Sequence, residues 1–214
     1  MNYLFLDASS TEVYGQVGTA HDFFPFQWNT ERNLASRLTR LCEEMLDRAG
    51  LRPYDIARFG LGTGPGSLTG LRVAASFMRT LALATDSPLT PIDLFTWSAH
   101  TLAAAGVTGP VRLTVPALLN QAFVVELDLP LEMPFIRLSP RLDLPGPSSN
   151  GIPTFGIRCE SPGVHRVDPS PAILHDLMQT AAPTGFDALL KALPLYVVPS
   201  QAELNLEKRR SSKQ

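Results

Sequence analysis

The part of the sequence whose residue types and spacing could bind a ligand is a glycine-rich stretch, GLGTGPGSLTGLR at residues 60–72. It follows a short apolar segment and runs into an apolar stretch from Val73 to Ala84, which is the order strand, loop, helix. A glycine loop at a helix N-terminus presents backbone N–H groups that can bind a phosphate. The stretch is therefore a candidate phosphate-binding loop.

The spacing of its residues does not match the two common phosphate loops. A P-loop places a lysine after its last glycine, whereas the first lysine of this chain is Lys191. The dinucleotide fingerprint would need glycine at Ser67 or at Thr69. The alternative, which stays open, is structural: Gly64 and Gly66 supply backbone angles closed to other residues, and Ser67 or Thr69 caps the helix.

Other catalytic arrangements also lack their required spacing. The four histidines include no pair four residues apart, so a zinc site of the H-E-x-x-H kind is not predicted. Ser67 does not lie in a G-x-S-x-G elbow, and Cys42 falls within an amphipathic helical pattern that favours a core position. The sequence therefore predicts no catalytic residue and no metal ligand.

Composition narrows the class of protein. The 214 residues are 44% hydrophobic and carry a net charge of -2, which gives no basic field to attract nucleic acid. The sequence has only two cysteines, which is typical of a reducing cytoplasm. It has no basic stretch before its first apolar residues and no run of about 20 apolar residues, so we expect neither a signal peptide nor a membrane span. These features predict a cytoplasmic protein.

The elements around the loop suggest two halves. Residues 3–7 are expected to form a buried strand that ends at Asp7, and helices are expected over 30–49 and 68–84. Most prolines lie beyond Gly106, where the pattern becomes less regular. We expect an N-terminal lobe over 1–105, a divergent second lobe over 106–199, and a polar basic tail over 200–214 that is frayed.

The stretch GTGPGSLTGLR resembles the signature of the TsaB (YeaZ) family, whose members take part in making threonylcarbamoyladenosine in tRNA. The segment LFLDASS, with Asp7 and Ser9, resembles the opening strand and turn of that family. The second half departs from the family pattern: PALLNQAFV stands where the family carries a polar D-A-R-x-G-E-V-Y segment. The signature positions in this sequence are Gly62, Gly64, Pro65, Gly66, Ser67, Thr69, Gly70 and Arg72.

This resemblance implies an α/β protein with the two-lobed actin-like ATPase (ASKHA) fold, in which mixed sheets are flanked by helices. It implies a non-catalytic subunit, without a cofactor, that pairs with a TsaD-like subunit and a TsaE-like ATPase and meets tRNA only indirectly. The residues after Asp7 agree with this role, because Ala8, Ser9 and Ser10 include no glycine through which backbone could approach a phosphate. An actin-like enzyme that hydrolyses ATP or acts on a peptide is the alternative.

In the TsaB (YeaZ) family, which the sequence resembles, the first two helices pair with the equivalent helices of TsaD. Here these are the helices expected over 30–49 and 68–84, and a homodimer through the same helices is a further possibility. The apolar residues expected at the interface could equally be core residues. They are Leu34, Leu38, Leu41, Met45, Ala74, Ala75 and Met78.

Overall fold

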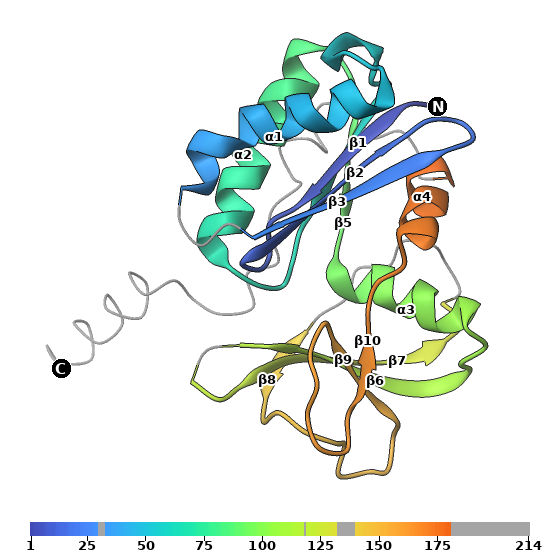
Figure 1. The fold of residues 1–214 in the computed structure, drawn as a ribbon. Coiled ribbons are helices and arrows are strands. Elements are labelled where there is room, and N and C mark those ends of the chain that lie inside the picture. Colours follow the sequence, from blue (N-terminus) through green and yellow to red (C-terminus); the bar gives the residue numbers. More distant parts are fainter. Residues whose placement is uncertain (30–32, 118, 132–139, 181–214) are drawn as a thin grey trace, which may run out of the picture.

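The computed structural model describes residues 1–29, 33–117, 119–131 and 140–180. These residues form two five-stranded mixed sheets, stacked one above the other in Figure 1 with helices between and above them. Among the described residues, no helix has the length and apolar character needed to cross a bilayer.

The first sheet has the strand order β3-β2-β1-β4-β5. Its strands are β1 (Tyr3–Asp7), β2 (Glu12–Gly18), β3 (Phe23–Asn29), β4 (Arg58–Gly62) and β5 (Leu89–Ile92). The first three strands form an antiparallel meander, and β4 and β5 continue the sheet in parallel to β1. Every residue of the central strand β1 is buried, and alternate side chains enter two different cores.

Helices α1 (Leu34–Ala49) and α2 (Leu68–Ala84) cover one face of this sheet (Figure 1). Leu4 and Leu6 of β1 pack there with the buried residues of both helices. A single 3-10 turn, η1 (Pro53–Asp55), connects α1 to β4. The expected bounds of the second helix, 68–84, are confirmed, whereas the first begins at Leu34 and Thr30 lies outside the described residues.

The second sheet has the order β10-β9-β6-β7-β8. Its strands are β6 (Gly109–Pro116), β7 (Ala122–Leu129), β8 (Arg141–Asp143), β9 (Thr154–Ile157) and β10 (His165–Val167). Strands β6, β7 and β8 are antiparallel, and β9 and β10 run parallel to β6. Each sheet therefore has the mixed pattern expected from the resemblance.

Helices α3 (Leu94–Ala104) and α4 (Pro171–Thr180) lie between the two sheets (Figure 1). They share one apolar core with Tyr3 and Phe5 from the first sheet and with Val111 and Leu113 from the second. Although α4 follows the second sheet in sequence, it packs against α3 and β3. The chain thus returns to the first sheet after completing the second.

Polar contacts fix α4 in this position. Arg58 Nη1 donates to the Met178 carbonyl at 2.7 Å, and the Tyr3 hydroxyl lies 3.1 Å from His175 Nδ1. Burial lowers the pKa of His175, which favours the neutral ring beside the tyrosine. The tail expected over 200–214 and the end of the second lobe beyond residue 180 lie outside the described residues.

Candidate functional site

The glycine loop packs directly on the turn that follows β1. A Cβ atom added at Gly66 would lie 2.0 Å from the Ser9 carbonyl oxygen, and one added at Gly70 would lie 2.1 Å from the Ala8 carbonyl oxygen. The Ser67 N–H donates to the Ser9 carbonyl at 2.6 Å. Because they have no Cβ atom, these glycines allow the backbone of the loop to contact the backbone of the turn after β1.

The rest of the loop joins β4 to α2 and α3. Gly64 has φ 87, a left-handed conformation that favours glycine, and its carbonyl accepts from the Leu94 N–H at 2.8 Å. The Ser67 hydroxyl caps α2 by accepting from the Gly70 N–H at 3.3 Å. Of the two capping residues considered from the sequence, the structure therefore uses Ser67, and Thr69 is exposed on the first turn of the helix.

Asp7 ends β1 with a carboxylate that is bound by the protein itself. Oδ1 accepts from the Ser9 N–H at 3.0 Å, and Oδ2 accepts from the Ser9 hydroxyl at 3.1 Å. Arg158 Nη1 donates to the same Oδ2 at 3.3 Å, and the aspartate side chain is only 3% exposed. Its charge is therefore compensated from within the chain.

Arg158 lies in the second lobe, directly after β9, and was not identified from the sequence. Its guanidinium carbon lies 5.6 Å from the ring centroid of Trp97 and 5.9 Å from that of Tyr14. Both distances are within the range of a cation–π interaction. Burial, the largest cause, raises the pKa of Tyr14, while the nearby charge of Arg158 acts in the opposite direction.

This arrangement differs from an anion-binding cradle. The atoms that the Asp7 turn presents to the loop are the carbonyl oxygens of Ala8 and Ser9, which would repel a phosphate. The loop lies too close to this turn for a ligand to enter between them. Within the described ranges, moreover, no three His, Cys, Asp or Glu side chains are grouped so that they could hold a metal ion.

The side chains that we expected at a partner interface are mostly core residues, which corrects that expectation. Six of the seven are buried inside the chain's own fold, and Leu34 is half-buried. The correction follows from the sheet, because the apolar stripe of each helix turns toward β1, β2 and β4. The buried six are Leu38, Leu41, Met45, Ala74, Ala75 and Met78.

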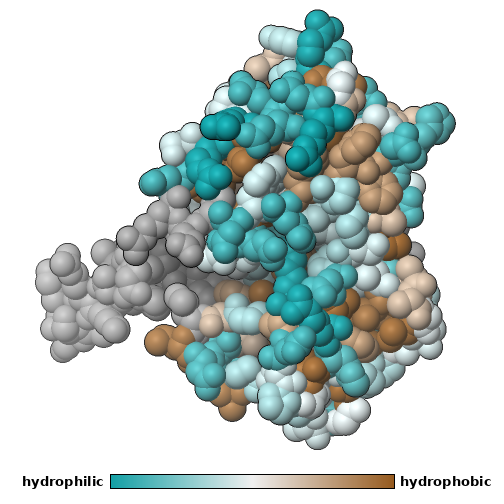
Figure 2. Space-filling model, in the orientation of Figure 1, coloured by the Kyte–Doolittle hydropathy of each residue, from teal (hydrophilic) through white to brown (hydrophobic). Residues whose placement is uncertain are grey.

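The outward faces of the two helices differ in character. The surface over α1 is mainly hydrophilic, as Figure 2 shows, and carries charged residues such as Arg40 and Glu44. The outer face of α2 carries Ser76 and Thr80, which are exposed, beside the half-buried Val73 and Phe77. Leu83 on the same helix is exposed over 62% of its surface. Arg72 of the signature is also exposed.

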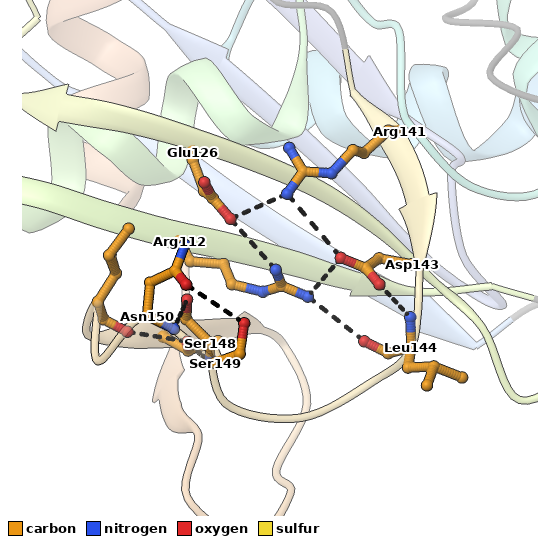
Figure 3. Close-up of polar contacts among 10 residues, drawn as sticks. Arg112, Glu126, Arg141, Asp143, Leu144, Ser148, Ser149 and Asn150 are labelled. Atoms are coloured by element: carbon orange, nitrogen blue, oxygen red, sulfur yellow. Dashed lines mark hydrogen bonds and ion pairs between the residues drawn. The ribbon is translucent and has the colours of Figure 1, made fainter.

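A second polar cluster lies on the second sheet (Figure 3). Arg112 Nη1 donates to Glu126 at 3.2 Å and its Nη2 donates to Asp143 at 3.1 Å, while Arg141 donates to Glu126 at 2.9 Å. Two positive and two negative side chains thus tie β6, β7 and β8 together. Because the charges balance, the cluster supports the sheet and offers no net charge to a ligand.

The segment PALLNQAFV runs from the last residue of β6 to the first residues of β7. The Ala117 N–H donates to the Gln121 carbonyl at 2.8 Å, and Leu119 and Asn120 both have positive φ. Leu119 is 92% exposed. Where the family pattern has a polar segment, this chain therefore joins two antiparallel strands, and Leu118 lies outside the described residues.

Sequence comparisons agree with the motif. The family model described as TsaD, tRNA N6-adenosine threonylcarbamoyltransferase, matches residues 28–129. The tRNA threonylcarbamoyladenosine biosynthesis protein TsaB of Haemophilus influenzae is 29% identical over 93 residues, or 44% of this chain and 39% of that protein. The TsaB protein of Bacillus subtilis is 30% identical over 76 residues, or 36% of this chain and 31% of that protein. The matched segments thus span well under half of these relatives.

A solved structure matches almost the whole fold. YeaZ from Pseudomonas aeruginosa superposes with a TM-score of 0.70 and covers 91% of this chain and 99% of its own, at 20% sequence identity. This likeness confirms the expected two-lobed α/β fold, including the second lobe.

Proposed function

We propose that this chain, a protein of the TsaB/YeaZ family, is a binding subunit without an active site of its own that supports a TsaD-like subunit in making threonylcarbamoyladenosine in tRNA. A TsaE-like ATPase is the further partner in this proposal, and tRNA is met only through the assembled complex. The TsaD-type match over residues 28–129 supports a partner of that kind, because related lobes often pair through equivalent surfaces.

The proposal that the chain has no active site of its own depends on the structure of the Asp7 turn. Its carboxylate is bound by Ser9 and Arg158, and its carbonyl oxygens rest on Gly66 and Gly70. A nucleotide would have to displace an internal ion pair and separate two backbone segments in order to bind at this position. The turn and the loop are therefore assigned to holding α2 in place.

Calorimetry can test the proposal that the isolated chain binds no nucleotide. Isothermal titration calorimetry of the isolated chain with ATP and Mg²⁺ is expected to give no binding heat beyond dilution. An unrelated ATP-binding protein measured in the same buffer supplies the positive control. Saturable binding, accompanied by ATP hydrolysis, would favour an actin-like enzyme and overturn this part of the proposal.

We place the proposed docking face on the outer face of α2, because the buried stripe of this helix packs in the chain's own core. Val73 and Phe77 lie only half-buried there, beside the exposed Ser76 and Thr80, and their buried parts pack against the chain's own core. Small and apolar side chains on an exposed helix face allow a partner helix to approach closely. A second copy of this chain could use the same face, and this homodimer would compete with the heterodimer.

Ser76→Arg is expected to prevent co-purification with the TsaD homologue of the same organism, with at least a roughly tenfold loss of affinity. The arginine would place a bulky charge at the centre of the proposed face, while the exposed position leaves folding unchanged. The measurement is a pull-down followed by a titration, with thermal unfolding of each variant.

The matched control is Ser149→Arg, which makes the same substitution at an exposed serine of the second lobe. It should retain full binding. Equal binding by the Ser76→Arg and wild-type proteins would show that the outer face of α2 is not the docking surface.

A further inference from the structure

Arg158 has a backbone conformation that favours glycine. Its φ is 55, in the left-handed region, and its N–H donates to the Val167 carbonyl at 2.9 Å. A residue with a long side chain adopts this conformation only at an energetic cost relative to glycine. The presence of arginine here therefore indicates that its side chain contributes something that a glycine would not.

That side chain crosses from the second lobe to the first. It is 18% exposed, and its guanidinium group donates to Asp7 at the end of β1. It also lies against Tyr14 of β2 and Trp97 of α3. One residue from the loop after β9 thus contacts three elements on the other side of the interface between the lobes.

Asp7 connects this contact to the start of α2. Its carboxylate accepts from the N–H of Ser9, whose own carbonyl accepts from the N–H of Ser67 at 2.6 Å. Ser67 in turn caps α2. A continuous series of hydrogen bonds therefore leads from the guanidinium group to the first turn of that helix.

We propose that Arg158 is an interlobe lock: its guanidinium group holds the second lobe against the Asp7 turn, and its release loosens both the turn and the first turn of α2. The lock acts within the isolated chain. Its effect on the outer face of α2 as a docking surface rests on the proposed function, but the opening of the turn does not.

A simple packing role makes a different prediction. If the side chain only filled space, Arg158→Gly would relieve the left-handed backbone and would leave the Asp7 turn protected. The lock predicts the opposite, because removal of the guanidinium group leaves the buried Asp7 carboxylate without its cation.

Amide hydrogen exchange of the full chain tests the lock. In Arg158→Gly, exchange in peptides that cover residues 7–14 and 66–71 is expected to become at least about tenfold faster than in the wild type. Millimolar guanidinium chloride should slow it again, whereas NaCl at the same concentration should not. Arg158→Lys, which keeps a cation but loses the planar group, should give an intermediate result.

The matched control is Arg166→Gly, which removes an exposed arginine that pairs with Asp168 in the same region. In this control, faster amide hydrogen exchange should be confined to peptides around β10. Unchanged protection of residues 7–14 in Arg158→Gly, or an equal increase in the Arg166→Gly control, would overturn the lock.

If Arg158→Gly does not fold, Arg158→Lys decides the question, and wild-type exchange at the Asp7 turn in that variant would overturn the proposal. Binding of the wild-type chain to the TsaD homologue is measured separately. If the wild-type chain binds no such partner but the Asp7 turn opens on loss of Arg158, the proposed function is wrong and the lock is still supported.

Discussion

Met78→Arg is expected to leave no stably folded protein. Met78 is fully buried in the core between α2 and the first sheet, where it packs with Leu4 and Leu6. An arginine at this position would bury an unpaired charge and exceed the volume of the site. Substitutions of this kind cost more than about 4 kcal/mol, a large share of the stability of a typical domain.

Circular dichroism and the yield of soluble protein measure this effect. Met78→Leu is the control and should lose less than about 1.5 kcal/mol, because it nearly conserves volume and polarity. Ser76→Arg places the same arginine two residues earlier, on the exposed face, and should fold normally. A folded Met78→Arg variant would contradict the assignment of this residue to the core.

The comparison of these two positions shows what the sequence could predict about α2. Its apolar spacing predicted a helix over 68–84, and the structure has that helix. Periodicity identifies an apolar face but does not say whether that face meets the chain's own sheet or a partner. The answer depends on the neighbouring strands, which cover the stripe containing Ala74 and Met78.

The glycine loop was predictable in part. The structural interpretation predicted special backbone angles at Gly64 and Gly66 and a helix cap at Ser67 or Thr69. In the structure Gly64 is left-handed and Ser67 is the cap. The main role of Gly66 and Gly70 is a close approach to the turn after β1. That approach joins segments far apart in the chain, so local turn preferences alone could not predict it.

Arg158 and Arg112 were both missed, for different reasons. Arg158 lies 151 residues from Asp7 along the chain, and no local pattern indicates their contact. Arg112 is directly opposite Glu126 in the β6–β7 register, a cross-strand pair that the alternating pattern of both strands could have indicated. The closing ion pair to Asp143, in contrast, required the position of β8.

Gly70→Ala should destabilise the protein, although alanine is the better helix former by about 1 kcal/mol. The added methyl group would lie 2.1 Å from the Ala8 carbonyl oxygen, and because this neighbour is backbone, the turn after β1 would have to move. Overpacking of this kind typically costs about 1–3 kcal/mol, enough to exceed the gain in helix propensity.

Thermal unfolding measures whether the cost of overpacking exceeds the gain in helix propensity. Each 1 kcal/mol of lost stability lowers the melting temperature by roughly 2–4 °C in a chain of this size. Ser76→Ala is the matched control, because it introduces alanine at an exposed position of the same helix and should change stability by less than about 0.5 kcal/mol. If Gly70→Ala were instead stabilised, propensity would outweigh packing, and α2 would not rest on the Asp7 turn. Destabilisation together with faster hydrogen exchange in residues 7–9 would connect this glycine to the same turn that Arg158 holds from the other lobe.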